Sequence, residues 1–282
     1  MRYLYAIIDL ILYSNLWIAC AAVAMAAQTQ LLLTGKVQPS PLLGFILFST
    51  LFLYALHRII GLAKVKPFQS HGRYQVITRF KLHIILYALL SAAAAAFCFF
   101  QLPFSVQASA VLPSLISLAY VLPFLKGKRL RDLNYIKIFL IAIAWSWITV
   151  YLPALELGMG RNIPMMIMAL ERAFFVFAIT LPFDIRDLEI DRFNGVQTIP
   201  ARWGVRTTKR LSLACLLAMM ALAGLNFHID VYSPGQFGAL ALSAITTYAL
   251  VTAAGQVKHD YYYTGVLDGT MVLQFVLVWG LG

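Results

Sequence analysis

Three aspartates, Asp184, Asp187 and Asp191, are the residues of this sequence whose spacing best suits chemistry. Together with Glu189 they place four of the chain's eleven acidic residues within eight positions, directly after an apolar run. On an α-helix, which turns by about 100° per residue, the three aspartates share a face roughly 60° wide and Glu189 points away from it. Carboxylates stacked on one helical face repel one another, so we expect a cation to lie between them.

A magnesium ion is the cation that these residues favour. Mg²⁺ binds hard oxygen ligands, usually one or two carboxylates, and completes its shell with water and phosphate oxygens. The pattern therefore predicts Asp184, Asp187 and Asp191 as metal ligands on a cavity-facing side of one helix. We expect that helix to end at Asn194 and Gly195, because glycine tolerates the left-handed conformation of a helix cap. The alternative interpretation is a solvated acidic turn without a function.

The composition of the whole chain indicates a polytopic membrane protein. Of its 282 residues, 61% are hydrophobic and 12% are charged, with a mean hydropathy of +0.81, whereas a soluble domain has about 25% charged residues. We therefore predict an all-α membrane bundle of about nine transmembrane helices, formed by a single domain, residues 1–282. The candidate spans are 5–27, 40–62, 81–101, 106–125, 136–153, 163–183, 211–229, 235–254 and 264–281. The fifth and ninth are short, so eight spans and a re-entrant segment are the alternative.

Basic residues are distributed unequally between the loops, which predicts an orientation. The segments that follow the second, fourth and sixth spans hold Arg58, Lys64, Lys66, Arg73, Arg79, Lys81, Lys126, Lys128, Arg129, Arg131, Lys137, Arg186, Arg192, Arg202, Arg206, Lys209 and Arg210. The intervening loops carry only Lys36 and Arg161. By the positive-inside rule, the N-terminus and the basic loops face the cytoplasm, and we expect a multi-pass protein of a bacterial plasma membrane. The net charge of +11 then requires no nucleic-acid partner.

The segment around the three aspartates resembles a known family. From Asp184 to Pro200 the chain reads D-x-x-D-x-x-x-D-R-x-x-G-x-Q-T-I-P. This run is similar to the second aspartate-rich motif of the UbiA-type intramembrane prenyltransferases, and the match extends over about twenty residues to Gly204. It includes Gly195, Gln197 and Pro200, so it is far more specific than an isolated D-x-x-D.

The resemblance implies a reaction and its components. These enzymes transfer a prenyl group from a polyprenyl diphosphate to an aromatic or lipid-like acceptor within the membrane. It therefore implies Mg²⁺ as cofactor, a prenyl diphosphate and a hydrophobic acceptor as partners, and Asp184, Asp187 and Asp191 as catalytic residues. The oligomeric state does not follow from the sequence.

Basic side chains are expected to stabilise the departing diphosphate. Lys137, just inside the fifth span, and Arg192, next to the last aspartate, are candidates for this role. For Arg192 an interfacial position is the alternative, and Lys126, Lys128 and Arg129 are better explained as determinants of topology.

The chain departs from the family in its second span, where a first motif of the form N-D-x-x-D-x-x-x-D is expected. Residues 54–62 read Tyr-Ala-Leu-His-Arg-Ile-Ile-Gly-Leu, and no acidic residue lies between Asp9 and Asp132. Arg58 stands where an aspartate is expected, and a guanidinium can hold phosphate in place of a metal. We therefore add Arg58 to the diphosphate-binding candidates, with a positive-inside residue as the alternative. His57 would be a poor Mg²⁺ ligand.

Three functional interpretations follow. The leading one is a prenyl transferase with one Mg²⁺-bearing triad, in which basic residues replace the other carboxylate set. The second is a degenerate relative that binds prenyl diphosphate or lipid without turnover. A transporter is the third; it would explain ionisable residues within the spans, where Asp9, Glu171 and Asp268 have no assigned role, but not the run from Asp184 to Pro200.

Overall fold

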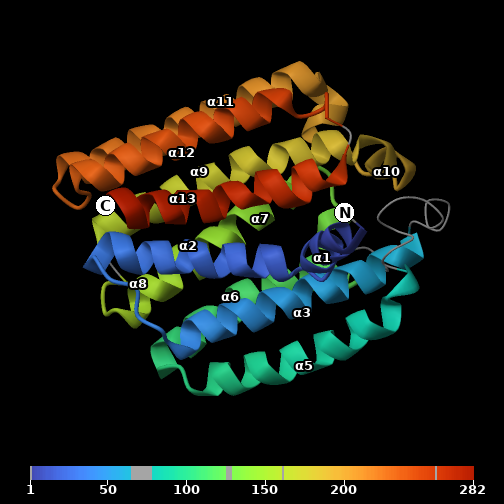
Figure 1. Cartoon of the computed structure of the whole chain (residues 1–282), viewed down its shortest axis with the longest axis horizontal. Coiled ribbons are helices and arrows are strands. Elements are labelled where there is room, and N and C mark those ends of the chain that lie inside the picture. Colours follow the sequence, from blue (N-terminus) through green and yellow to red (C-terminus); the bar gives the residue numbers. More distant parts are fainter. Residues whose placement is uncertain (1, 65–77, 125–128, 161, 258) are drawn as a thin grey trace.

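The protein is a bundle of helices that lie side by side along their lengths (Figure 1). The computed structural model describes residues 2–64, 78–124, 129–160, 162–257 and 259–282. Within these ranges the chain forms helices and no β-strand, which confirms the predicted all-α class.

Nine helices of the described ranges are long and apolar enough to cross a membrane. They are α2 (Leu16–Thr34), α3 (Pro41–Lys64), α5 (Lys81–Phe100), α6 (Phe104–Val121), α7 (Ile136–Ser146) with its continuation η3 (Trp147–Tyr151) and α8 (Leu152–Glu156), α9 (Ile163–Arg186), α11 (Ile199–His228), α12 (Pro234–Ala253), and η4 (Tyr262–Leu267) continuing into α13 (Asp268–Leu281). The N-terminus and the C-terminus lie toward opposite ends of the bundle (Figure 1), as an odd number of spans requires. The alternative of eight spans and a re-entrant segment is not observed.

The first span begins later than the sequence predicts. Instead of one helix over 5–27, a short helix α1 (Arg2–Tyr13) precedes α2, and the chain turns between them at Asn15. Asn15 has a left-handed backbone with φ +66°, which asparagine tolerates better than most residues. Its buried side chain donates a hydrogen bond to the Tyr87 hydroxyl at 3.2 Å. Hydropathy alone does not reveal such a turn, because the residues on both sides of it are apolar.

Small residues allow α2 to occupy the centre of the bundle. Its alanines at positions 19, 21, 22, 24, 26 and 27 are all buried. Side chains of this size let neighbouring backbones approach closely, which is how helices associate in lipid. In Figure 1, α2 accordingly lies between α13 on one side and α3 on the other.

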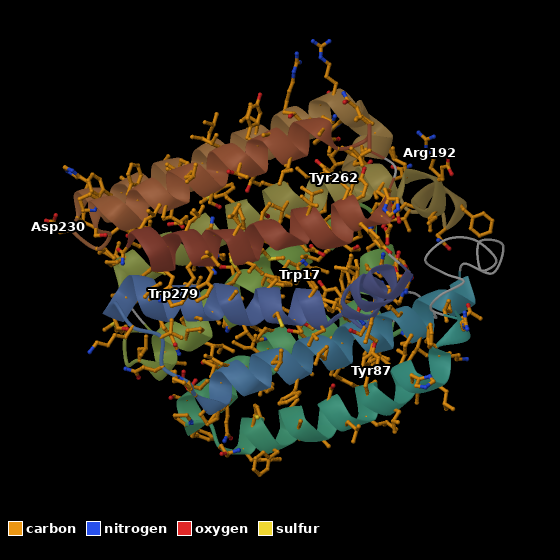
Figure 2. The ribbon with its side chains drawn as sticks, in the orientation of Figure 1. Trp17, Tyr87, Arg192, Asp230, Tyr262 and Trp279 are labelled. Atoms are coloured by element: carbon orange, nitrogen blue, oxygen red, sulfur yellow. The ribbon has the colours of Figure 1, made fainter. Side chains whose placement is uncertain are left out.

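Two of the spans contain a π-helical turn, η3 and η4. In η3, the carbonyl of Thr149 accepts a hydrogen bond from the Thr29 hydroxyl at 2.6 Å. Near the middle of the bundle (Figure 2), the Trp17 indole donates to the carbonyl of Gly265 in η4 at 3.0 Å. In such wide turns, backbone carbonyls can accept hydrogen bonds from side chains of other helices. π-helical turns also occur often beside functional sites.

A buried charged cluster joins four parts of the bundle. Glu171 and Arg172, adjacent on α9, are each only 1% exposed. The Tyr232 hydroxyl donates to a Glu171 carboxylate oxygen at 2.9 Å. Arg172 donates to the carbonyl of Met25 at 2.8 Å and approaches the Thr149 hydroxyl at 3.4 Å. These contacts give Glu171 a structural role that the sequence did not assign.

We predict that Arg172→Met lowers the thermal unfolding midpoint of the purified protein in detergent. The change removes the buried donor to the Met25 carbonyl and the Thr149 hydroxyl, and each buried polar group left without a partner costs about 1–3 kcal/mol. Arg210→Met, the same change at an exposed position of α11, serves as the control. Equal midpoints for the two variants would contradict a stabilising role for Arg172.

Candidate functional site

A cavity of about 370 Å³ opens between the helices, toward the end of the bundle where α1 and α10 (Leu188–Phe193) lie (Figure 1). Part of its wall is apolar, with Leu53, Ile116, Ile141, Ala144 and Ile148. The other part is charged and contains Arg58, Arg129, Arg131, Asp132, Lys137, Asp184, Arg186, Asp187, Asp191, Asp260 and Asp268. A ligand that fits this cavity is expected to have a charged and an apolar part.

The three aspartates of the sequence motif line the same cavity. The helix that carries them is interrupted: α9 ends at Arg186, and α10 begins after Asp187, whose ψ of 8° departs from helical geometry. The Asp187 and Asp191 amides still donate to the carbonyls four residues earlier, both at 2.9 Å. The shared cavity face predicted from the spacing is therefore present, whereas one uninterrupted helix is not.

The predicted end of this helical segment is confirmed. α10 ends at Phe193, Asn194 is its C-cap, and Gly195 has a left-handed backbone with φ +71°. The amide of Val196 then donates to the Asp191 carbonyl at 2.9 Å. This turn directs the chain back so that Val196 packs into the cavity wall.

Lys137 supplies the cation that the aspartates require. Its ammonium nitrogen lies 2.5 Å from Asp184 Oδ1 and 3.2 Å from Asp191 Oδ2. All three residues are buried, with exposed fractions of 7% for Lys137, 1% for Asp184 and 7% for Asp191. The sequence predicts Lys137 as a diphosphate ligand, but it does not reveal that this side chain bridges two of the three aspartates.

Asp187 is paired with the neighbouring Arg186. The guanidinium donates through Nε and Nη2 to the two Asp187 carboxylate oxygens at 2.9 and 3.1 Å, and through Nη1 to Asp260 at 2.9 Å. It also lies 5.0 Å from the ring centroid of Phe183 and 5.3 Å from that of Tyr263. The two parallel hydrogen bonds to Asp187, together with the flanking aromatic rings, hold the Arg186 guanidinium in one orientation.

Arg58 lies in the cavity wall. It donates to the carbonyl of Leu12 at 3.3 Å, and its guanidinium lies 5.6 Å from the ring centroid of Tyr13. Burial raises the pKa of Tyr13, and Asp260, to which Tyr13 is hydrogen-bonded, adds to that shift. The α1 end of the cavity is therefore closed by a neutral phenol beside a guanidinium.

His57 is also in the wall, where Arg131 contacts its ring nitrogens. The Arg131 guanidinium lies 5.5 Å from the ring centroid of Tyr120. Burial works against the charge on Arg131, but Tyr120 and then the carboxylates of Asp191, Asp187 and Asp132 raise its pKa above the usual value. The position of the missing first motif is thus occupied by fixed positive charge.

Other sequence predictions have different outcomes. Arg192 is exposed, is not among the cavity-lining residues, and points away from the bundle at its end (Figure 2). Arg129 is buried and forms an ion pair with Asp132 at 2.8 Å. Asp9 lies in α1 and accepts a hydrogen bond from the Tyr261 hydroxyl. The predictions for Lys66, Arg73, Lys126 and Lys128 fall outside the described residues.

Arg131, Asp260 and Asp268 were missed as members of the site. Asp268 was noted as an ionisable residue within a span, and the structure places it in the cavity wall directly after η4. Ionisable residues within or beside spans were the available signal. Their distance along the chain from the aspartate motif prevented any assignment to the same site.

The charged wall fits a resident Mg²⁺ ion poorly. Asp184 and Asp191 already share an ammonium, and Asp187 is held in the Arg186 fork. Across the described ranges no three His, Cys, Asp or Glu side chains are grouped so that they could hold a metal ion. The donor set expected for Mg²⁺, carboxylates that are open to the ion, is therefore not assembled.

Comparisons with known proteins identify the architecture. No protein-family model matches the chain, and no curated protein matches its sequence. A solved UbiA homologue from Archaeoglobus fulgidus, bound to GPP and Mg²⁺, matches with a TM-score of 0.68 at 12% identity, over 95% of this chain and 98% of that one. The chain has the UbiA-type fold. The resemblance seen in the motif thus extends to the whole bundle.

Two further UbiA-type structures agree. The apo structure of a UbiA homologue from Aeropyrum pernix K1 has a TM-score of 0.64 at 14% identity, covering 95% of this chain and 94% of that one. A digeranylgeranylglyceryl phosphate synthase has a TM-score of 0.61 at 13% identity, covering 100% and 99%. At this level of identity, the comparison establishes the UbiA-type fold and the function has to be argued from the cavity.

We predict that Gly195→Ala destabilises the turn after Asp191. A Cβ at Gly195 meets nothing within 4 Å, so only the left-handed backbone, φ +71°, opposes it, at a cost of about 1–2 kcal/mol. Gly238→Ala is the matched control, because Gly238 lies inside the helix α12 with open space around it and alanine is favoured there by about 0.5–1 kcal/mol. The unfolding midpoints of the two variants should therefore shift in opposite directions. A Gly195→Ala midpoint at or above that of the wild type would show that the left-handed backbone imposes no cost on alanine here.

Proposed function

We propose that the protein transfers a prenyl group from a polyprenyl diphosphate to a hydrophobic acceptor within the membrane. The observation that carries the proposal is the cavity itself, in which an apolar wall adjoins a charged wall with six carboxylates and five basic side chains. The basic side chains are Arg58, Arg129, Arg131, Lys137 and Arg186. A prenyl diphosphate has the same division, because a multiply charged head is attached to an uncharged isoprenoid chain.

The basic side chains of the charged wall suit the diphosphate. Guanidinium groups form short, charge-assisted hydrogen bonds to phosphate oxygens, and they do so most strongly where water is excluded. Arg58 and Arg131 are the guanidiniums on the part of the wall where the first aspartate motif is missing. They are therefore the residues that would contact the head group, in place of carboxylate-bound metal.

The apolar wall suits the first isoprene units and the reacting carbon. Cleavage of the allylic carbon–oxygen bond leaves the electron pair on the diphosphate and a positive charge on the prenyl carbon. The basic residues stabilise the former. The aromatic side chains of Tyr54, Tyr120 and Trp145, which line the cavity, present electron-rich faces that stabilise the latter.

The fold relatives support this assignment. The Archaeoglobus fulgidus homologue has been solved with GPP or DMAPP and Mg²⁺, and a digeranylgeranylglyceryl phosphate synthase shares the fold. These ligands are prenyl diphosphates, so the class of donor is the part of the proposal that the comparison supports best. The acceptor is aromatic or lipid-like by the same analogy.

The second candidate function is binding of a prenyl diphosphate or lipid without turnover. One observation favours it: Ala55, Arg58 and Leu62 stand where the family's first motif has aspartates. A transporter, the third interpretation, has no comparable observation in its favour. Release of diphosphate from DMAPP, GPP and longer donors by the purified protein separates an enzyme from a binder.

We also propose that the cavity end faces the cytoplasm. Arg192, Arg202 and Arg206 lie in or next to the segment that joins α9 to α11 at that end, and the positive-inside rule places such segments on the cytoplasmic side. The basic loops predicted from the sequence agree with this orientation, and the charged head group of the donor would then lie toward the cytoplasm.

We predict that Arg58→Ala lowers kcat/KM for diphosphate release about ten- to a hundredfold. This is the cost of losing one charge-assisted contact, about 1.5–3 kcal/mol. Arg58→Lys should restore part of the activity, since lysine keeps the charge and loses the fork. Arg206→Ala, an exposed arginine near the same end of the bundle, is the control.

Wild-type turnover that Arg58→Ala leaves unchanged would contradict the role of Arg58. Absence of diphosphate release with every donor, combined with measurable binding of the donors, would favour the non-catalytic candidate instead.

A further inference from the structure

Lys137 is held in place by the backbone as well as by its own ion pairs. It lies in the first turn of α7, two residues after Tyr135, which has a left-handed backbone with φ +63°. The Tyr135 amide donates to the Gln197 carbonyl at 3.1 Å, and its hydroxyl donates to the Gln197 side chain at 2.9 Å. The Gln197 amide in turn donates to the Asn134 side chain at 2.8 Å.

These three hydrogen bonds join the start of α7 to the segment that follows Asp191. The main chain next to Lys137 is therefore linked directly to the main chain that follows Asp191, although the two residues are 54 positions apart. Backbone hydrogen bonds thus support the contact between the Lys137 ammonium and the Asp191 carboxylate, in addition to the ion pair itself.

A divalent ion would have to displace this ammonium. The described ion pairs of Lys137 are with Asp184 and Asp191, and its side chain is 8% exposed. If a metal took the two carboxylates, a lysine charge would be left buried next to a second positive charge. Leaving a buried charge without its partner costs several kcal/mol. The arrangement therefore disfavours a metal at the two carboxylates that would be its best ligands.

Asp187, the third carboxylate of the motif, is also poorly placed to bind a metal ion. Asp187 is held on both oxygens by Arg186. On the α3 side, where a second ion would need acidic ligands, the cavity wall has His57 and Arg58. On one side of the cavity the carboxylates that would hold a metal are thus paired with basic side chains, and on the other side His57 and Arg58 stand in their place.

We infer that Lys137 takes the place of a divalent metal in this cavity, so that the protein binds prenyl diphosphate without Mg²⁺. The inference rests on the proposed function and departs from the Mg²⁺ dependence that the motif predicts. In this arrangement Asp184 and Asp191 are the counter-ions that keep Lys137 charged and fixed, and the head group is bound by side-chain cations alone. The ammonium can present its remaining N–H to a phosphate oxygen, since lysine has three donors.

Binding and metal uptake can be measured separately. The probe is a thiolo analogue of geranyl diphosphate, which resists cleavage, and its Kd for the purified full-length protein is measured by calorimetry after EDTA treatment and again with excess Mg²⁺. We expect the two Kd values to agree within about twofold. Mn²⁺, a paramagnetic substitute for Mg²⁺, should show no stoichiometric binding by electron paramagnetic resonance.

Lys137→Met tests the residue itself. Without the ammonium, Asp184 and Asp191 become available to a divalent ion, so we expect stoichiometric Mn²⁺ binding to appear and analogue binding in EDTA to weaken about tenfold or more. Mg²⁺ should then restore part of the affinity. Lys137→Arg keeps the charge and should remain independent of metal, and Arg192→Met, an exposed cation near the motif, should behave as the wild type does.

Each outcome of these measurements supports or overturns the inference. Wild-type binding that EDTA weakens tenfold or more, or stoichiometric Mn²⁺ binding by the wild type, overturns the inference and leaves the proposed function intact. Failure of the wild type to bind the analogue under either condition overturns both. A folded Lys137→Met variant that stays independent of metal removes Lys137 from the explanation. The wild-type measurements decide the question even if that variant does not fold.

Discussion

The ion pairs of Lys137 with Asp184 and Asp191 are the interaction on which the site depends. They join α7, α9 and α10 at the end of the bundle where the cavity opens. Two carboxylates and an ammonium lose hydration when they are buried, and only close mutual contacts offset that cost. Because Asp184 is on α9 and Asp191 on α10, the lysine also connects the two helices across the break at Asp187. The shape of the charged wall follows from this constraint.

Other charged residues of the cavity wall, and a buried pair elsewhere in the bundle, are likewise placed next to charges of opposite sign. Arg186 holds Asp187 and Asp260, Arg129 holds Asp132, and Glu171 lies next to Arg172. Arg172 and Tyr232 connect α2, η3, α9 and the start of α12 in a region that does not line the cavity. Polar groups in such surroundings must be satisfied by other parts of the protein. The cavity is the place where this charge compensation is arranged around a space that can admit a ligand.

Several features could be predicted because they depend on neighbouring residues. The apolar stretches located nine spans, since crossing a bilayer requires a continuous run of apolar side chains. The spacing of Asp184, Asp187 and Asp191 placed them on one cavity face, and Gly195 indicated where the helical segment ends. The turn at Asn15 and the break at Asp187 were not foreseen. Both occur where the local sequence is compatible with a continuous helix and contacts with distant residues decide otherwise.

The sequence by itself determined the class of the protein, the approximate number of its spans and the carboxylate face around which the site is built. Only the tertiary structure decided what faces those carboxylates. Lys137, Arg131, Asp260 and Asp268 come from segments far apart in the chain, and a side chain's partner across a bundle depends on how helices rotate and pack. The sequence therefore predicted that a cation would lie between the aspartates, because like charges repel locally. That the cation is a lysine of another helix could not be read from the motif, because their meeting depends on the fold.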